Sequence, residues 1–190
     1  MHTELLAHIK RFVSLTPEEE KIVKGYVHTQ DVKYKELVLK SGQVCDAYYF
    51  VVKGVLRMYT LTDNGTEHIV QFAIDNWWMS DYTSFDTQKP SLFSIQALEP
   101  TTVIVIDKKV QETLFQEVPK LERYFRLIFQ RAYTATLMRV HFIFSSSGEA
   151  RYHHFNNSFP EFVQRIPQYM LASYLGFTPE FLSKIRAKKI

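Results

Sequence analysis

The chain has 190 residues, of which 46% are hydrophobic and 15% are aromatic. This composition excludes a disordered chain, and the length allows one or two domains with a sizeable core. The formal net charge of +3 is unevenly placed, because residues 139–190 hold seven Lys and Arg against three acidic residues. A basic segment on a near-neutral body is what attraction to phosphate groups requires.

The cysteine content and the N-terminal residues indicate the compartment. Cys45 is the only cysteine, so neither an intrachain disulfide nor a CxxC metal site is expected. Charged and imidazole side chains interrupt the first residues, so we expect no signal peptide, and no run of 18 apolar residues predicts a membrane span. We therefore expect a cytoplasmic protein with no membrane partner, no metal and no cofactor.

Residues 1–30 are predicted to be helical. Thr16 precedes Pro17 and three glutamates, which is the pattern of a capped helix start with Glu19 placed for a capping box. After residue 32 the pattern changes to short β segments separated by turn residues. Strands are predicted at 36–40, 47–52, 55–61, 68–73, 94–98 and 102–107. This succession indicates an antiparallel sandwich or barrel, with its strongest hairpin signal at Asp63-Asn64-Gly65.

Beyond residue 107 the pattern is helical again. A short helix is predicted at 110–118, and one long helix from Pro119 to about Phe144. The long helix carries a 4-3 apolar stripe that we expect to be its dimerisation face: Leu121, Phe125, Ile128, Ala132, Ala135 and Phe142. A second apolar set lies beside the stripe, so the helix needs cover from the β domain and from a second copy of the chain. Full burial within a monomer is the alternative. A shorter helix is predicted at about 149–157.

The last stretch, from residue 166, is predicted to form two short helices joined by a tight turn. Gly176 can take the left-handed conformation that ends the first helix, and Thr178 and Pro179 are typical of the start of the second. A basic, partly exposed second helix is typical of a DNA-reading helix-turn-helix, and an ordinary helical hairpin with a solvated basic tail is the alternative. The candidate DNA-binding residues are Thr178, Pro179, Glu180, Ser183, Lys184, Arg186, Lys188 and Lys189.

The order of these elements resembles the Crp/Fnr family of bacterial transcription regulators over essentially the whole chain. The motifs that carry the resemblance are the run from Ser41 to Gly54, Ala97-Leu98-Glu99-Pro100-Thr101, and the run from Leu175 to Arg186. The resemblance implies an α+β fold with three parts. These are an antiparallel β-roll (a double-stranded β-helix, or jelly roll) with N-terminal helices at 1–118, a long dimerisation helix at 119–146, and an all-α helix-turn-helix domain at 147–190. It also implies a homodimeric regulator rather than an enzyme, with double-stranded DNA and RNA polymerase as partners.

The expected effector cassette departs from the family. Cyclic-nucleotide binders carry a Gly-Glu pair and, downstream, an Arg-Ser or Arg-Thr pair, and these slots fall here on Ser80-Asp81 and near Ser91-Leu92. Lys89 is the only basic residue between Asn76 and Lys108. A buried phosphate without a guanidinium would lose its charge-assisted contact and still be desolvated. We therefore expect no cAMP binding of the usual kind.

The same segment is rich in aromatic residues. The candidate effector pocket is formed by Phe72, Trp77, Trp78, Ser80, Asp81, Tyr82, Ser91, Leu92 and Phe93. Such a pocket suits a small apolar or planar ligand, but we favour the alternative that the rings fill the roll themselves. The effector, if one exists, is not identified by the sequence.

The chain stops at Ile190, just past the recognition helix, so we expect no β-hairpin wing and a weaker, salt-sensitive complex with DNA. Two alternative functions remain open. The first is a ligand-binding sensor with weak or lost DNA binding. The second is an enzyme on a cupin-like barrel, which we discount because His68 is the only strand histidine.

Overall fold

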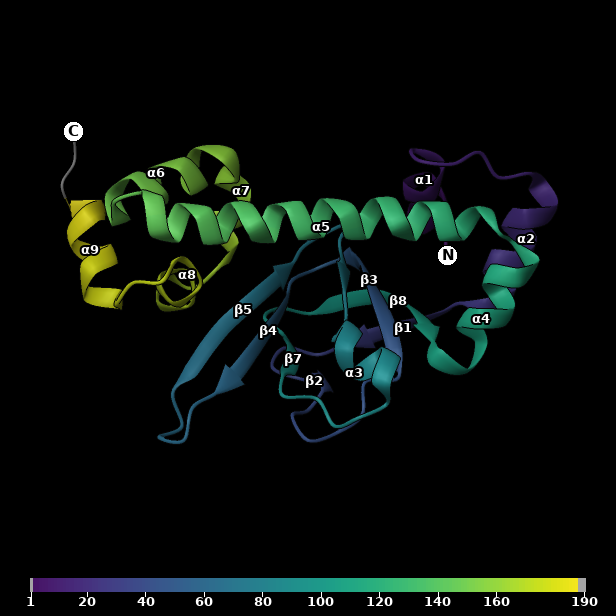
Figure 1. Cartoon of the computed structure of the whole chain (residues 1–190), viewed down its shortest axis with the longest axis horizontal. Coiled ribbons are helices and arrows are strands. Elements are labelled where there is room, and N and C mark those ends of the chain that lie inside the picture. The colour runs from purple at the N-terminus through teal and green to yellow at the C-terminus, as the bar shows by residue number, and fades with distance from the viewer. Residues whose placement is uncertain (1, 188–190) are drawn as a thin grey trace.

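The computed structural model describes residues 2–187 and shows a β-roll with a long helix along it and a helical domain at one end (Figure 1). Helices α1 (Thr3–Lys10) and α2 (Pro17–Tyr26) precede the roll. The capping box that begins α2 is present, because Thr16 and Glu19 exchange side-chain and backbone hydrogen bonds. In the described part of the chain, none of the helices combines the length and the apolar character that a membrane span requires.

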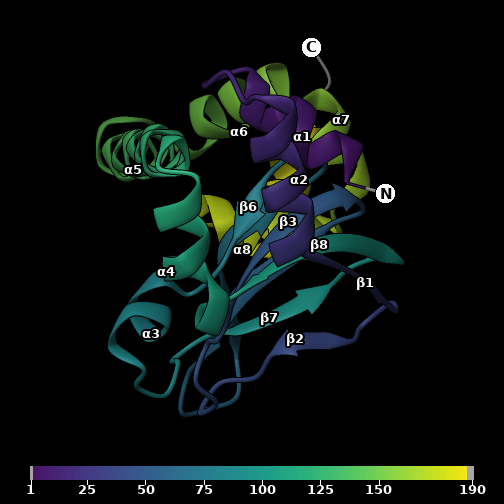
Figure 2. The same cartoon turned by 90° about the vertical axis from the view of Figure 1, so that its right-hand side faces the viewer.

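The roll consists of two four-stranded sheets in which the paired strands run antiparallel, as the turn pattern predicted. One sheet has the order β1 (His28–Val32), β8 (Thr101–Asp107), β3 (Ala47–Lys53), β6 (Trp78–Met79). The other has the order β2 (Leu37–Leu39), β7 (Ser94–Ala97), β4 (Leu56–Leu61), β5 (Glu67–Ala73). Figure 2 shows α1 and α2 on the side of the β1-β8-β3-β6 sheet.

Strand β3 shows why the core forms here. Five successive residues of this strand are buried rather than alternate ones. Tyr49 points into the roll, where its hydroxyl donates to the carbonyl of Val38 at 3.0 Å. Phe50 points the other way, and its ring centroid lies 5.3 Å from that of His8 on α1. Both faces of the strand are covered, so its side chains form a continuous apolar run.

Four elements differ from the sequence prediction. β1 replaces the end of the expected N-terminal helix, because the backbone of His28–Val32 pairs with β8. β6 and the short helix α3 (Tyr82–Thr87) form within the expected effector cassette. A further helix, α7 (Pro160–Arg165), follows α6 (Gly148–Ser158).

Helix α4 (Lys108–Glu117) leads into α5 (Lys120–Ser145), whose 26 residues extend for about 39 Å. In Figure 1, α5 runs from the N-terminal helices to the helical domain. That domain contains α6, α7, α8 (Gln168–Leu175) and α9 (Pro179–Ala187). Its apolar core is continuous with Val55, Tyr59, Ile69 and Phe72 of the roll, so the domain sits against the outer face of β4 and β5.

Candidate functional site

Asp81 is the residue that we expected, from its order along the chain, at the ribose-binding position of cyclic-nucleotide binders. It caps the N-terminus of α3, where its Oδ1 accepts the backbone N–H groups of Thr83 at 3.1 Å and Ser84 at 3.2 Å. Its Oδ2 accepts the hydroxyl of Ser91 at 2.6 Å. The carboxylate is buried, and both of its oxygens are bound within the chain.

The neighbouring hydroxyl groups are also occupied. Ser80 donates to the carbonyl of Ala47 at 2.8 Å, and the thiol of Cys45 lies 3.2 Å from the Ser80 hydroxyl. Ser91, besides its bond to Asp81, accepts the backbone N–H of Phe93 at 2.9 Å. The cassette therefore satisfies its own polar groups, as buried polar groups in folded proteins generally do.

The rings of the cassette pack against α5. Trp78 lies with its ring centroid 5.1 Å from that of Phe125, and its Nε1 donates to the hydroxyl of Tyr124 at 2.7 Å. Tyr82 meets Phe129 edge-on at 4.7 Å, and burial raises its pKa. Tyr82 and Trp78 also contact Tyr48 and Phe50, so both rings pack between α5 and the outward face of β3 rather than inside the roll.

Three members of the predicted effector set do not join the others. Phe72 lies on the outer face of the sheet, where its ring contacts those of Phe162 and Tyr174 in the helical domain. Trp77 is 42% exposed and Leu92 is 75% exposed. The prediction grouped them by proximity in sequence, whereas adjacent strand residues point to opposite faces of a sheet and loop residues can point to solvent.

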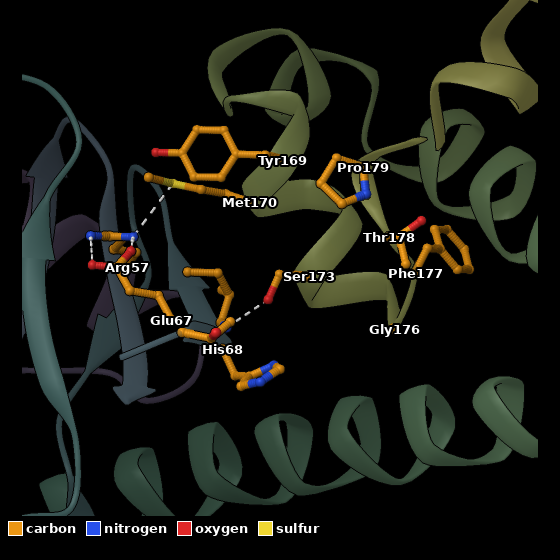
Figure 3. A pocket seen from close by; sticks show the side chains of 12 residues that line it. Arg57, Glu67, His68, Tyr169, Met170, Ser173, Gly176, Phe177, Thr178 and Pro179 are labelled. Atoms are coloured by element: carbon orange, nitrogen blue, oxygen red, sulfur yellow. Dashed lines mark hydrogen bonds and ion pairs between the residues drawn. The ribbon is translucent and has the colours of Figure 1, made fainter. Parts of the chain in front are cut away.

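A groove of about 720 Å³ that the sequence analysis missed lies between the β4–β5 hairpin and the helical domain (Figure 3). Its base is the buried Arg57, whose guanidinium donates to Glu67 at 2.5 and 3.0 Å and to Gln96 at 2.9 and 2.6 Å. A charged residue within the apolar strand 55–61 was the available signal, because a buried arginine requires partners. The lining residues are Arg57, Thr66, Glu67, His68, Ile69, Tyr169, Met170, Ser173, Gly176, Phe177, Thr178 and Pro179.

Helix α9 is built as the sequence predicted. Gly176 ends α8 in the left-handed conformation, with φ at 77°, and the hydroxyl of Thr178 accepts the backbone N–H of Phe181 at 3.2 Å. Leu182 and Ile185 are buried and anchor the helix in its domain.

The opposite face of α9 is exposed and polar. It presents Pro179, Glu180, Ser183, Lys184 and Arg186 at the end of the molecule (Figure 1). Hydrogen bonds from its own backbone N–H and from the Thr178 hydroxyl, together with the charge of Lys184, hold the pKa of Glu180 below its usual value. Lys188, Lys189 and the question of a wing lie outside the described residues.

The comparisons with known proteins agree with this architecture. Residues 29–118 match the family model of the cyclic nucleotide-binding domain. The transcriptional activator protein Anr of Pseudomonas protegens is 29% identical over 100 residues, which cover 53% of this chain and 40% of that relative. The structure of FixK2 from Bradyrhizobium japonicum has a TM-score of 0.74 at 14% identity, with 85% of this chain and 83% of that chain covered. The global regulator CLP of Xanthomonas campestris, described as responsive to c-di-GMP, has a TM-score of 0.75 at 12% identity, with 91% of each chain covered.

The Crp/Fnr resemblance is confirmed. The family model covers nearly all of β1 and continues through α4, and the two solved structures share the fold over 85% and 91% of this chain. The aligned part of Anr is less than half of that protein. Within residues 2–187, no group of three or more His, Cys, Asp and Glu side chains could hold a metal ion.

The structure places the start of the predicted dimerisation stripe in the core of the roll. Leu121 and Phe125 are 1% and 3% exposed and lie in the core of the roll, and Ile128 is partly buried against it. They therefore leave little surface for a partner. Ala132 and Ala135 are exposed, and Phe142 is half-buried with its ring 4.6 Å from that of His154 on α6.

A different apolar stripe on α5 is exposed. It consists of Tyr133, Leu137, Val140 and Phe144, which follow 4-3-4 spacing and have exposed fractions of 66, 49, 40 and 86%. Each residue advances a helix by about 100°, so this stripe lies roughly a third of a turn from the one that faces the roll. The 4-3-4 spacing is that of the apolar seam of a coiled coil.

Proposed function

We propose that this chain is a homodimeric, DNA-binding transcription regulator whose DNA binding does not require a cyclic nucleotide. Its parts would be the effector-type roll at 1–118, the long helix at 119–146 and the DNA-binding domain at 147–190. The observation that carries the proposal is the exposed basic face of α9, on a capped helix held at the end of the molecule. At a promoter, such a dimer would have RNA polymerase as its further partner.

The exposed face of α9 offers the groups that read a major groove. Lys184 and Arg186 can donate to guanine or to phosphate oxygens, and Glu180 can accept from the amino group of cytosine. The lowered pKa of Glu180 keeps that side chain an acceptor. Ser183 lies on the same exposed face and can donate or accept.

Independence from cyclic nucleotides is supported by the state of the cassette. Asp81 and Ser91, at the two expected contact positions, are hydrogen-bonded to each other. The buried Arg57 lies in the groove toward the helical domain and is paired with Glu67 and Gln96. A cyclic phosphate at Asp81 would therefore meet a carboxylate without a guanidinium to neutralise it. The Trp78 and Tyr82 rings pack there against α5.

The homodimer is supported by the exposed stripe of Tyr133, Leu137, Val140 and Phe144. Apolar side chains that recur on one face of an exposed helix are costly to leave in water. A second copy offers the same stripe in a symmetric pairing, which buries both. This arrangement would place two α9 helices on one assembly, as successive half-sites of a duplex require.

The experiment that tests the proposal combines genomic selection of bound DNA with a mobility-shift assay on the selected fragment, with and without cAMP. We expect a discrete sequence to be enriched, the same affinity in both conditions, and a dimer in sedimentation. If no sequence is enriched, or if the protein sediments as a monomer, the proposal of a homodimeric DNA-binding regulator is refuted. Affinity that rises with cAMP would overturn its independence from the nucleotide.

A further inference from the structure

The helical domain rests on the roll through apolar contacts as well as through the connection along α5. Tyr59, Ile69 and Phe72, on the outer face of β4 and β5, belong to the same buried cluster as Phe162 and Leu171 of the helical domain. The centroids of the Phe72 and Phe162 rings are 5.2 Å apart. Burial of this kind opposes separation, but apolar contact is non-directional and does not by itself fix an orientation.

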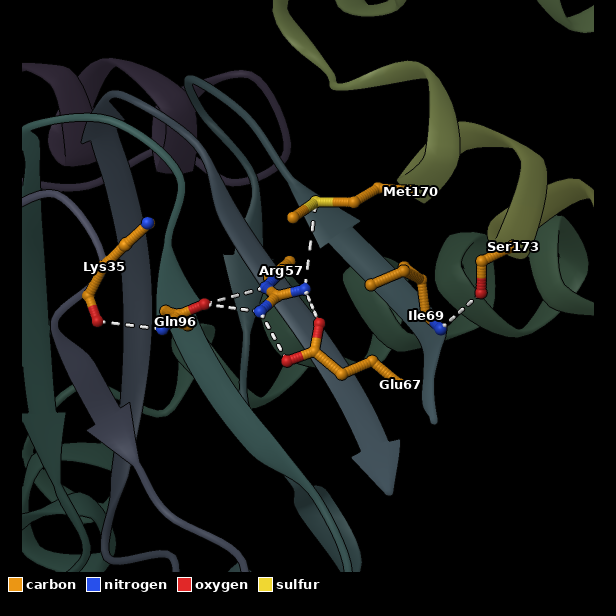
Figure 4. Close-up of polar contacts among 7 residues, drawn as sticks. All are labelled: Lys35, Arg57, Glu67, Ile69, Gln96, Met170 and Ser173. Carbon is orange, nitrogen blue, oxygen red and sulfur yellow. Dashed lines mark hydrogen bonds and ion pairs between the residues drawn. The ribbon is translucent and has the colours of Figure 1, made fainter. Parts of the chain in front are cut away.

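Directional contacts hold the domain along β5, which is the edge strand of its sheet. The backbone N–H of Ile69 donates to the hydroxyl of Ser173 on α8 at 3.0 Å (Figure 4). The carbonyl of the next residue, Val70, accepts from Nη1 of Arg139 on α5 at 2.7 Å. The guanidinium of Arg139 also lies 4.6 Å from the ring centroid of Tyr174 on α8. One short stretch of edge strand is therefore bound to both α8 and α5.

A second anchor lies beyond the end of β5. Arg165, the last residue of α7, donates through Nη2 to Glu99 at 2.6 Å and to Asp75 at 3.3 Å. Asp75 is itself held, because its Oδ1 accepts the backbone N–H of Gly54 at 2.8 Å. Burial opposes the charge of Arg165, but the two carboxylates outweigh it and leave the pKa above its usual value.

The two anchors together restrict rotation of the helical domain. Asp75 lies six positions after Ile69 and two beyond the end of β5, so the two anchors are at most about 20 Å apart along the chain. A body held at one point can pivot about it, whereas a body held at two separated points on a broad apolar contact cannot. The orientation of α9 relative to α5 is therefore set by the contacts of Ser173, Arg139 and Arg165.

We propose that these contacts form a domain latch that sets the half-site spacing accepted by the dimer. The proposal rests on the proposed function, since spacing has meaning only for a dimer that binds DNA. Half-sites read by paired helices lie about 34–36 Å apart, and each inserted base pair adds about 3.4 Å and a rotation of roughly 35°. A latched pair of α9 helices cannot follow that displacement, and an unlatched pair can.

The test compares variants on operators that differ only in spacing. The latch variants are Ser173→Ala, Arg139→Gln and Arg165→Gln. The control is Arg123→Gln, which removes the same charge from an exposed position on α5. Mobility shifts are measured on the selected operator and on the same operator with one base pair added between the half-sites. Circular dichroism and sedimentation establish that each variant is folded and dimeric.

We expect the wild-type protein and Arg123→Gln to lose about an order of magnitude in affinity on the lengthened operator, the scale of a single mismatched base pair. The latch variants should lose several-fold less. Glu99→Gln should relax the spacing preference as Arg165→Gln does. Combining the two substitutions should add little to the effect of either one, because both remove the same contact. Arg165→Lys should recover part of the preference.

The outcomes distinguish a failure of the latch proposal from a failure of the proposed DNA binding. If the latch variants weaken binding by the same factor on both operators, the contacts only stabilise the fold and the latch is refuted. If their spacing preference equals that of Arg123→Gln, it is refuted as well, with DNA binding intact. If the wild-type protein selects no DNA, the proposed function fails and the spacing proposal fails with it.

Discussion

The hydroxyl of Tyr124 on α5 lies 2.7 Å from Nδ1 of His8 on α1. The same hydroxyl accepts the indole N–H of Trp78 at 2.7 Å, so its own proton is directed to His8. This arrangement requires an unprotonated Nδ1. Burial, with additional repulsion from Arg11 and Arg131, lowers the pKa of His8 to about 4. A neutral imidazole thus joins the N-terminal helix to the long helix.

The first prediction concerns stability against pH. The ordinary pKa of histidine is 6.5, so between pH 6.5 and about 4 the unfolded chain binds a proton at His8 that the folded chain does not. The stability that His8 contributes is complete above pH 6.5 and is lost as the pH falls through that window, by up to roughly 3 kcal/mol. Urea unfolding at pH 7.5 and pH 4.5 should show a larger loss for the wild-type protein than for His8→Gln. Equal losses would contradict this role.

The second prediction concerns the capping carboxylate of the cassette. Asp81→Ala removes the cap of α3 and leaves the Ser91 hydroxyl without its acceptor, so we expect a loss of about 1–3 kcal/mol in the free energy of unfolding. Asp86→Ala changes an exposed carboxylate on the same helix and serves as the control, with a change close to zero. Thermal and urea denaturation measure both. A neutral result for Asp81→Ala would mean that the network is not formed in solution.

The third prediction is that cAMP does not bind the roll. A ligand that binds the folded state raises the midpoint of thermal unfolding in proportion to its affinity. Asp81 and Ser91 are hydrogen-bonded to each other. We therefore expect cAMP neither to shift the midpoint of thermal unfolding nor to release heat on titration. Micromolar binding that disappears in Asp81→Ala would show that the network opens to admit the nucleotide.

The fourth prediction distinguishes the two faces of α5. Val140→Glu places a charge in the exposed stripe and should weaken the dimer by at least about two orders of magnitude, because burying an unpaired charge costs several kcal/mol. Ala135→Glu places the same charge on the face that the sequence alone favoured, which is also exposed, and should leave the dimer intact. Sedimentation over a dilution series separates the two. The reverse pattern would restore the original stripe.

The fifth prediction tests the reading helix. Lys184→Ala should weaken binding to the selected operator by about 1–3 kcal/mol. If the contact is to phosphate, the slope of the logarithm of the binding constant against the logarithm of salt concentration should fall by about one. Lys109→Ala, an exposed lysine on α4, removes the same charge far from α9 and is the control. Mobility shifts at several salt concentrations provide both quantities. If the two variants behave alike, Lys184 contacts no DNA.

Local features of the fold were predicted well because their causes are local. The Thr16 cap and the left-handed Gly176 each depend on a few adjacent residues, and both are present. The hairpin at Asp63-Asn64-Gly65 also forms, with Gly65 at φ 79°. β1 was missed because its polar sequence shows no apolar alternation, and its pairing partner β8 lies more than 60 residues away.

The candidate site was predicted only in part. The polar face of α9 follows from helical spacing and lies where it was expected. In the cassette, Trp77 and Trp78 are neighbours in sequence, yet one is exposed and the other is buried against α5. Trp77 precedes β6 and Trp78 begins it, and which of two such neighbours faces the core depends on the packing of the whole sheet.

The sequence by itself determined that α5 is a long helix with apolar residues on more than one face, since helical spacing relates residues of one segment to each other. Only the tertiary structure decided that Leu121 and Phe125 face the roll and that Leu137 and Val140 face outward. The physical reason is that periodicity defines angles around a helix axis but not the rotation of that helix against its neighbours. That rotation is set by the shape of the roll and by contacts such as Tyr124 with His8.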